Sequence, residues 1–169
     1  MMRILGVDPG LRATGYAVLQ GSPRGVRLHV CGVIRTDDAA SLPARLHMIH
    51  TAMIGVITRH RPDGLAVEDL YAAQRFPRTA ILMGHVRGVV CLAAAEHELP
   101  VDALSPAAVK QAISGFGGAS KSQMQSSVQR LLGIVGTVDS HASDAAAMAL
   151  VVLSRRGVPL VTLREEAVR

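Results

Sequence analysis

A chain of 169 residues with 49% hydrophobic and 18% charged side chains has the size and composition of one folded domain. These values exclude a disordered chain, and the longest apolar run, residues 145–153, is too short to cross a bilayer. The net charge of +5 favours a polyanionic partner. The first residues lack a secretory apolar region, so we expect a cytoplasmic protein with no membrane partner.

Three strands joined by glycine-containing turns are predicted at the start of the chain. Apolar residues cluster at residues 3–8, 16–20 and 26–35, and the turns between them suit antiparallel hairpins. We assign Gly10 and Gly15 to the first turn. Cys31 and Cys91 lie far apart without metal-ligand spacing, which predicts reduced thiols in the core.

Helices and short strands alternate in the rest of the chain. Apolar residues at helical spacing predict an amphipathic helix over residues 43–60, a buried strand at 65–68, a helix at 77–98 and a strand at 101–104. Three further helices, at residues 106–114, 121–132 and 141–156, follow capping serines, Ser105, Ser120 and Ser140. This order predicts an α/β domain with a mixed five-stranded sheet flanked by helices over residues 1–156, and a loosely held tail at 157–169.

Two acids end apolar strands, and two further polar residues share one helix face. Asp8 and Glu68 each follow buried strand residues, where an unpaired carboxylate is costly. His141 and Asp144 lie three residues apart in the first turn of a helix, so they point the same way. The four side chains together predict a site for two Mg²⁺ or Mn²⁺ ions that clamp a phosphodiester.

Each of these residues also has a simpler interpretation. An acid near a helix N-terminus is favoured by the helix dipole, which suffices for Asp144 taken alone. His141 alone fits a surface position of the first turn. Glu68 fits a purely structural role less well, because an acid seldom ends a buried strand. All the simpler interpretations must hold at once to exclude a metal site.

Five short motifs carry a resemblance to a known family. They are GVDPGLRATGYAV at residues 6–18, AVE at 66–68, VKQ at 109–111, KSQ at 121–123 and HASDA at 141–145. In this order and spacing they resemble the RuvC family of bacterial Holliday-junction resolvases. The resemblance implies a ribonuclease-H-like fold and a homodimer that makes paired symmetrical nicks in four-way DNA junctions during recombination and repair. It also implies Mg²⁺ or Mn²⁺ as cofactor and the branch-migration proteins RuvA and RuvB as partners.

The resemblance places the four catalytic and metal-binding positions on Asp8, Glu68, His141 and Asp144. Many members carry Asp where this chain has His141, so the usual set of four acids is altered. A neutral imidazole nitrogen suits Mn²⁺ better than Mg²⁺, which predicts a preference for Mn²⁺.

Only two of the 18 basic residues counted as Lys or Arg are lysines, Lys110 and Lys121. Codon bias toward arginine accounts for this equally well as a requirement for a compact ammonium group at both positions. Both lysines match family lysines near the scissile phosphate, and the resemblance implies that they neutralise charge in the transition state.

Few aromatic residues occur, so each is a candidate DNA contact. Tyr71 follows Glu68 by three residues, and the resemblance implies that it stacks on an unpaired base at the junction centre. Phe116 lies in a glycine-rich loop and either contacts DNA or folds back onto the protein. Arg75, Arg78 and Arg87 are candidate phosphate contacts, although ordinary surface positions suit any single arginine better. Gly84 and Gly88 permit close helix packing, which fits the family's dimer.

Three other functions compete with this one. A sugar kinase or actin-like ATPase also ends its first strand with an acid before a turn, but needs two such domains. A ribonuclease H carries a catalytic Glu on its first long helix, whereas residues 43–60 contain no acid. A junction-binding protein without catalysis does not require the four polar site residues. Cleavage of a four-way junction with and without Mn²⁺ discriminates among them.

Overall fold

A central five-stranded sheet separates two layers of helices. A computed structural model describes residues 1–69 and 77–163 of the chain. The strands are β1 (Met2–Asp8), β2 (Ala13–Ser22), β3 (Gly25–Arg35), β4 (Gly64–Glu68) and β5 (Val101–Leu104), in the order β3-β2-β1-β4-β5. The first three pair antiparallel, and β1, β4 and β5 pair parallel. The predicted mixed five-stranded sheet is therefore confirmed.

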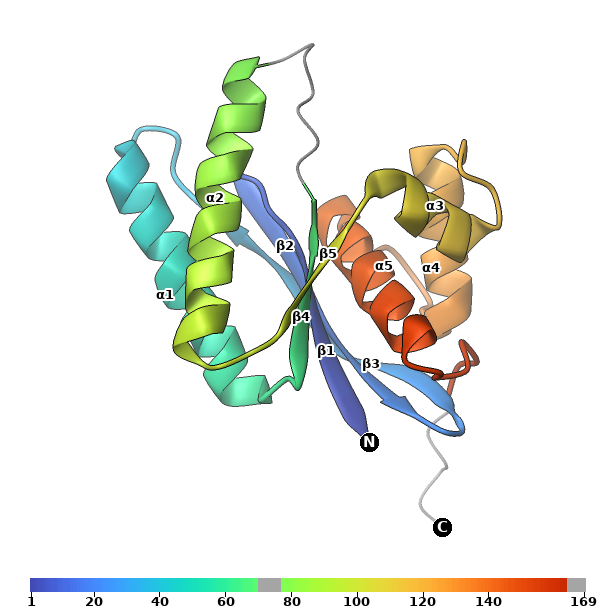
Figure 1. Cartoon of the computed structure of the whole chain (residues 1–169). Helices are drawn as coiled ribbons and strands as arrows, with labels where there is room; N and C mark the ends of the chain where they lie inside the picture. Colours follow the sequence, from blue (N-terminus) through green and yellow to red (C-terminus); the bar gives the residue numbers. More distant parts are fainter. Residues whose placement is uncertain (70–76, 164–169) are drawn as a thin grey trace.

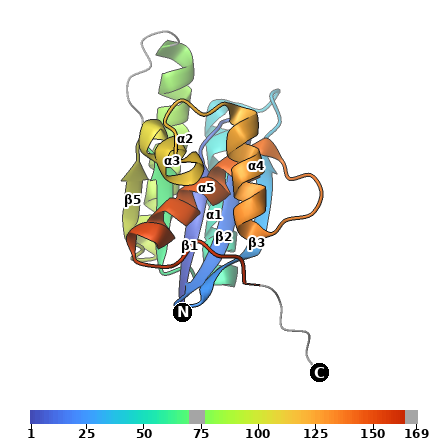
Figure 2. The same cartoon turned by 90° about the vertical axis from the view of Figure 1, so that its right-hand side faces the viewer.

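The helices divide between the two faces of the sheet. α1 (Leu42–His60) and α2 (Pro77–Glu96) cover one face, while α3 (Pro106–Ser114), α4 (Lys121–Leu132) and α5 (Ser140–Arg155) cover the other (Figures 1 and 2). Residues on alternate sides of β1 enter separate cores. Ile4 packs toward α5, and Leu5 and Val7 pack toward α1 and α2. The alternation of side chains along a strand places Asp8 on the same side as Ile4.

Capping residues define most helix starts as the sequence predicts. Ser105 and Ser120 cap α3 and α4, and Gln123 completes a capping box on α4. The prediction that Ser140 caps α5 is wrong. Asp139 caps it instead, accepting from the backbone N–H of His141 at 2.9 Å, because its carboxylate is also held by Arg35 of β3 at 2.7 Å.

The first part of the C-terminal segment is attached to the domain. The backbone N–H of Val26 donates to the carbonyl of Val161 at 2.9 Å, and that of Leu163 donates to the carbonyl of Val26 at 2.9 Å. Thr162 also donates its hydroxyl to the carbonyl of Leu131 at 2.8 Å. The prediction of a loosely held tail is therefore wrong for residues 157–163, because these backbone groups find partners on β3 and α4.

α5 lies unusually close to the sheet because two glycines face it. A Cβ on Gly6 of β1 would collide with the backbone carbonyl of Ala145, and one on Gly15 of β2 would collide with that of His141. Gly15 is thus a strand residue paired with Asp8, and its assignment to the first turn is wrong. Gly10 does lie in that turn, where its carbonyl accepts from the hydroxyl of Thr14 at 2.7 Å.

The contact at Gly6 predicts a large loss of stability when a methyl group is added. Gly6→Ala should lower the free energy of unfolding by about 3 kcal/mol or more, because a backbone carbonyl cannot move aside as a side chain can. Gly55→Ala on α1 is the matched control, because nothing lies within 4 Å of a Cβ there. It should raise stability by up to about 1 kcal/mol through helix propensity. Urea denaturation measures both, and equal effects would contradict the close approach of α5.

Candidate functional site

The predicted acids lie at one edge of the sheet. Val7 and Val67 are register partners in the parallel pair of β1 and β4, so Asp8 and Glu68 leave adjacent strand ends. Side chains alternate along β4 as they do along β1, which sends Glu68 to the α5 face together with Asp8. Two acids that are 60 residues apart in sequence thus converge through strand pairing alone.

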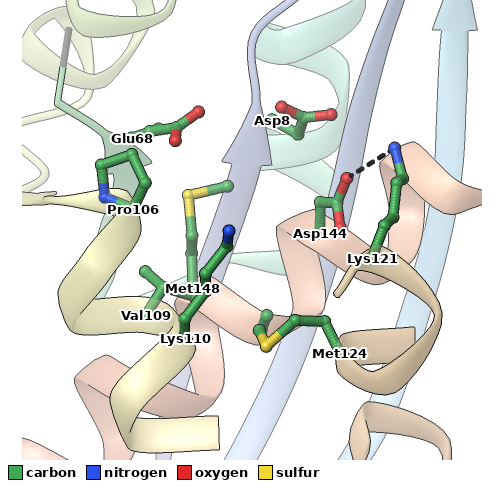
Figure 3. A pocket seen from close by; sticks show the side chains of 10 residues that line it. Asp8, Glu68, Pro106, Val109, Lys110, Lys121, Met124, Asp144 and Met148 are labelled. Atoms are coloured by element: carbon green, nitrogen blue, oxygen red, sulfur yellow. Dashed lines mark ion pairs between the residues drawn. The ribbon is translucent and has the colours of Figure 1, made fainter. Parts of the chain in front are cut away.

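α5 brings the third carboxylate to the same place. Asp8, Glu68 and Asp144 line a pocket of about 280 Å³, with Lys110 of α3 and Lys121 of α4 beside them (Figure 3). Its remaining lining is mostly apolar, comprising Pro106, Val109, Met124, Ala147 and Met148. We call this hollow the carboxylate pocket. Its three acids come from three separate elements, which is the arrangement the sequence predicts.

His141 contacts the site from the side. Its Nδ1 lies 2.7 Å from Oδ2 of Asp8, so the imidazole is hydrogen-bonded to this carboxylate. However, His141 does not line the carboxylate pocket. It lines a neighbouring hollow, which shares Asp8 and extends toward α1 and α2. The structure thus joins His141 to Asp8 directly through this hydrogen bond.

Burial and repulsion between carboxylates raise the pKa values of two of these acids. Burial raises the pKa of Asp8 above its ordinary value, even though the hydrogen bond from His141 acts in the opposite direction. Burial also raises the pKa of Glu68, and the nearby charges of Asp8 and Asp144 raise it further. Such shifts mean that the ionised carboxylates disfavour the folded state until a cation neutralises them.

The two lysines reach this acidic pocket from different helices. Nζ of Lys121 lies 3.3 Å from Oδ2 of Asp144, and Lys110 moderates the rise in the pKa of Glu68. The side chain of Lys121 is 60% exposed, so its ammonium group remains open to solvent and to a bound phosphate. The structure therefore places both predicted lysines at the predicted acids.

The donor set fits a hard divalent cation. Carboxylate oxygens are the ligands that Mg²⁺ and Mn²⁺ accept, and three are available around one hollow. Among the described residues, no three or more Asp, Glu, His or Cys side chains are already arranged around a single point. In the proposed site, a bound ion would relieve the repulsion among these carboxylates.

Arg87 of α2, which the sequence suggests only as a candidate phosphate contact, supports the end of β4. Its Nε donates to the carbonyl of Glu68 at 3.1 Å, and its guanidinium lies 3.5 Å from the carboxylate of Asp69. Arg87 thereby fixes the backbone from which the Glu68 side chain projects. Only its position on the helix that follows Glu68 could have suggested this role from sequence.

The predicted DNA contacts are only partly within the described residues. Tyr71 and Arg75 lie outside them. Arg78 is exposed at the start of α2, and Phe116 is 65% exposed after α3. Neither of these two lines the carboxylate pocket.

Comparison with known proteins decides which family combines this fold with these motifs. The family model for crossover junction endodeoxyribonuclease RuvC matches residues 4–152. This chain belongs to the RuvC family. A RuvC of Rhodopirellula baltica is 44% identical over 147 residues, covering 87% of this chain and 82% of that protein. A RuvC of Granulibacter bethesdensis is 40% identical over 149 residues, covering 88% and 83% respectively.

Solved RuvC structures share the fold. Thermus thermophilus RuvC superposes with a TM-score of 0.83 at 32% identity, covering 93% of this chain and 98% of that one. The same RuvC in complex with a Holliday junction substrate gives a TM-score of 0.84 at 32% identity, covering 93% and 96%. The predicted RuvC resemblance and ribonuclease-H-like fold are thus confirmed over nearly the whole chain.

The raised pKa of Glu68 predicts that removing its charge stabilises the protein without metal. Glu68→Gln should raise the melting temperature in EDTA at neutral pH by a few degrees, because a buried charge beside two acids is removed. This gain should shrink as the pH falls through the raised pKa of Glu68, and it should be absent below about 4, where the wild-type carboxyl is protonated in both the folded and the unfolded state. Thermal unfolding against pH measures it.

Glu98→Gln is the control for this prediction, since Glu98 is exposed and remote from the acids. It should leave the melting temperature unchanged across the same pH range. If Glu68→Gln behaved like this control, the acids would not repel one another in the folded protein.

Proposed function

We propose that this RuvC-family chain is a metal-dependent endonuclease that resolves four-way DNA junctions by paired symmetrical nicks in recombination and repair. One observation carries the proposal. Three carboxylates from β1, β4 and α5 face one pocket together with two lysines. The junction complex of the similar Thermus thermophilus RuvC supports the choice of substrate. The raised pKa values of Asp8 and Glu68 support a divalent cation as cofactor, because a bound cation would stabilise their ionised forms.

Asp8, Glu68 and Asp144 would hold Mg²⁺ or Mn²⁺, as two ions in each site. Bound ions of this kind activate a water molecule and neutralise the charge that develops on a phosphodiester. His141 would complete the proposed ligand set through Nδ1, the ring nitrogen that faces Asp8 at 2.7 Å, with a bound ion taking the place of this hydrogen bond, and its nitrogen donor supports a preference for Mn²⁺.

The lysines bind and orient the substrate phosphate in this proposal. Lys121 lies against Asp144 with its ammonium exposed, so an incoming phosphate can share it. Lys110 lies beside Glu68 in the same pocket. Their positive charge stabilises the phosphorane-like transition state without a change of position.

Contacts farther along the DNA are assigned to four residues outside the proposed metal site. We assign base stacking at the junction centre to Tyr71, and phosphate contacts to Arg75 and Arg78. Phe116 is a second candidate for base contact, supported by its exposed ring. The net charge of +5 supports a large electrostatic share of the binding energy.

A homodimer would place two such sites on one junction. α2 carries an unpartnered apolar face among the described residues, with Ile81 60% and Leu92 52% exposed and open space around Gly88. By length and composition the stretch Arg78–Glu96 could also span a bilayer, with 22% of it buried, although helices of water-soluble proteins meet the same criteria. We assign the face to dimer contact in the cytoplasm, with RuvA and RuvB as further partners.

The metal-site assignment predicts a loss of nicking with binding retained. Asp8→Asn should reduce single-turnover nicking of a four-way junction at least about a hundredfold, because one carboxylate of the metal site is lost. Junction affinity should change little, since phosphate neutralisation by basic residues supplies most of it.

Asp102→Asn is the control. Asp102 lies on β5 outside the pocket, and its carboxylate is paired with Arg156. Residual nicking by Asp8→Asn within tenfold of wild type would refute the catalytic role of Asp8. Junction cleavage and gel-shift titration on the same preparations separate the two effects.

The ligand role of His141 predicts a change in metal preference. His141→Asp should raise nicking with Mg²⁺ relative to Mn²⁺, because a hard carboxylate replaces an imidazole nitrogen. The measurement is the ratio of single-turnover rates in the two metals for each protein. An unchanged ratio would show that His141 orients Asp8 through its 2.7 Å hydrogen bond and does not bind the ion.

A further inference from the structure

Asp8 borders a second hollow on the α1 and α2 side of the site. This hollow has a volume of about 470 Å³, which lies within the range of small-molecule sites. It shares only Asp8 with the carboxylate pocket. We call it the flank cavity, and it is lined by Asp8, Pro9, Gly10, Leu11, Arg12, Ala13, Arg45, Thr79, Leu82, Met83 and His141.

The walls of the flank cavity combine apolar surface with guanidinium groups. Leu11 lies on the turn after β1, and Leu82 and Met83 lie on α2. Arg45 and Arg12 supply two positive charges next to these apolar side chains. Both are paired with one carboxylate, that of Asp38, at 2.9 and 2.7 Å. Asp8 also lines the cavity, so these two arginines are matched by two carboxylates, and Arg12 is the cation that lies exposed at the rim.

The arginine at the back of the cavity is fixed in place. The side chain of Arg45 is only 10% exposed, and its Nε donates to the hydroxyl of Thr36 at 2.8 Å. The same hydroxyl donates to the carbonyl of Leu11 at 2.6 Å, and the backbone N–H of Thr36 donates to the carbonyl of Arg12 at 3.2 Å. These bonds hold the turn that follows Asp8, so the cavity wall is rigid before any ligand binds.

The cavity-facing side of α2 differs from its proposed dimer face. Leu82 and Met83 share a helix face with core residues of α2. Val86 follows them by four and three residues, and Val90 by eight and seven. Ile81 and Leu92, which are seven and four residues from Gly88, follow the exposed stripe instead. If a second copy of the chain bound to the face that carries Ile81 and Leu92, the flank cavity would remain accessible to another ligand.

We propose that the flank cavity binds the nucleotide adjacent to the scissile phosphate. Its base or sugar packs against Leu11, Leu82 and Met83, and its phosphate pairs with Arg12, which is 81% exposed at the rim. A flat apolar group joined to an anion is the ligand that such a mixed lining fits. This proposal rests on the proposed junction-nicking function and adds to it a nucleotide subsite on the far side of Asp8.

The experiment compares Leu82→Ser with wild type on three junctions. One junction is intact, and the other two carry an abasic site on the 5′ or the 3′ side of the scissile phosphate. Leu82→Ser should nick the intact junction about tenfold more slowly, because a base loses its apolar contact. Wild type should slow similarly on one of the two abasic junctions, and on that junction the substitution should add no further loss.

Met48→Ser is the matched control, since Met48 is an exposed apolar residue of α1 that does not line the cavity. It should nick all three junctions at wild-type rates. Equal slowing of Leu82→Ser on all three junctions, or no slowing at all, would overturn the base contact. Absence of nicking by wild type on the intact junction would instead refute the proposed function.

The phosphate contact has a separate test. Arg12→Ala should weaken junction binding and reduce by about one the slope of its logarithmic affinity against logarithmic salt concentration. Arg156→Ala is the control, because Arg156 is likewise ion-paired but with Asp102 on β5. An unchanged affinity and salt slope for Arg12→Ala would overturn the assignment of Arg12 to the nucleotide's phosphate.

Discussion

The close approach of α5 to β1 and β2 is the constraint on which the site depends. Gly6 and Gly15 leave no room for a side chain beneath the carbonyls of Ala145 and His141. The same stretch of α5 carries Asp144, so a helix displaced outward by the thickness of a methyl group would withdraw this acid from Asp8. Packing of the core and placement of the third carboxylate are therefore one requirement, met by two glycines.

The buried carboxylates that form the site lower the stability of the folded protein. Burial raises the pKa of both Asp8 and Glu68, so the folded protein confines charges that water would solvate better. The ammonium of Lys121 offsets part of the repulsion at Asp144, but its 60% exposure limits the effect. In the proposed metal site, a divalent cation would offset the repulsion among these carboxylates.

Much of this arrangement follows from local sequence. The apolar runs of β1 and β4 and the acid at the end of each predict where Asp8 and Glu68 converge. The features that the sequence does not reveal depend on distant partners. Asp139 and Ser140 are both good capping residues, and only the ion pair with Arg35 selects Asp139. Gly15 follows a turn motif closely enough to suggest a turn, whereas its role comes from contact with α5, over a hundred residues away.

The burial of Arg45 can be predicted from the sequence, but its hydrogen-bond partners cannot. It precedes the buried residues Ile49 and Met53 by four and eight positions, a spacing that assigns it to the buried face of α1. Its partners, Thr36 and Asp38, lie in the connection before that helix and have no periodic signal. The hollow that Arg45 lines also needs residues from β1, β2, α2 and α5, so only the folded chain defines it.

We propose that α5 and the ends of β1 and β4 together form one metal site. The most direct measurement is anomalous scattering from crystals of the wild-type protein grown with Mn²⁺. The account predicts a strong peak bounded by the carboxylates of Asp8, Glu68 and Asp144, which disappears in crystals of Gly15→Ala or shifts away from Asp144. A fully occupied Mn²⁺ peak elsewhere, with none at these carboxylates, would contradict it.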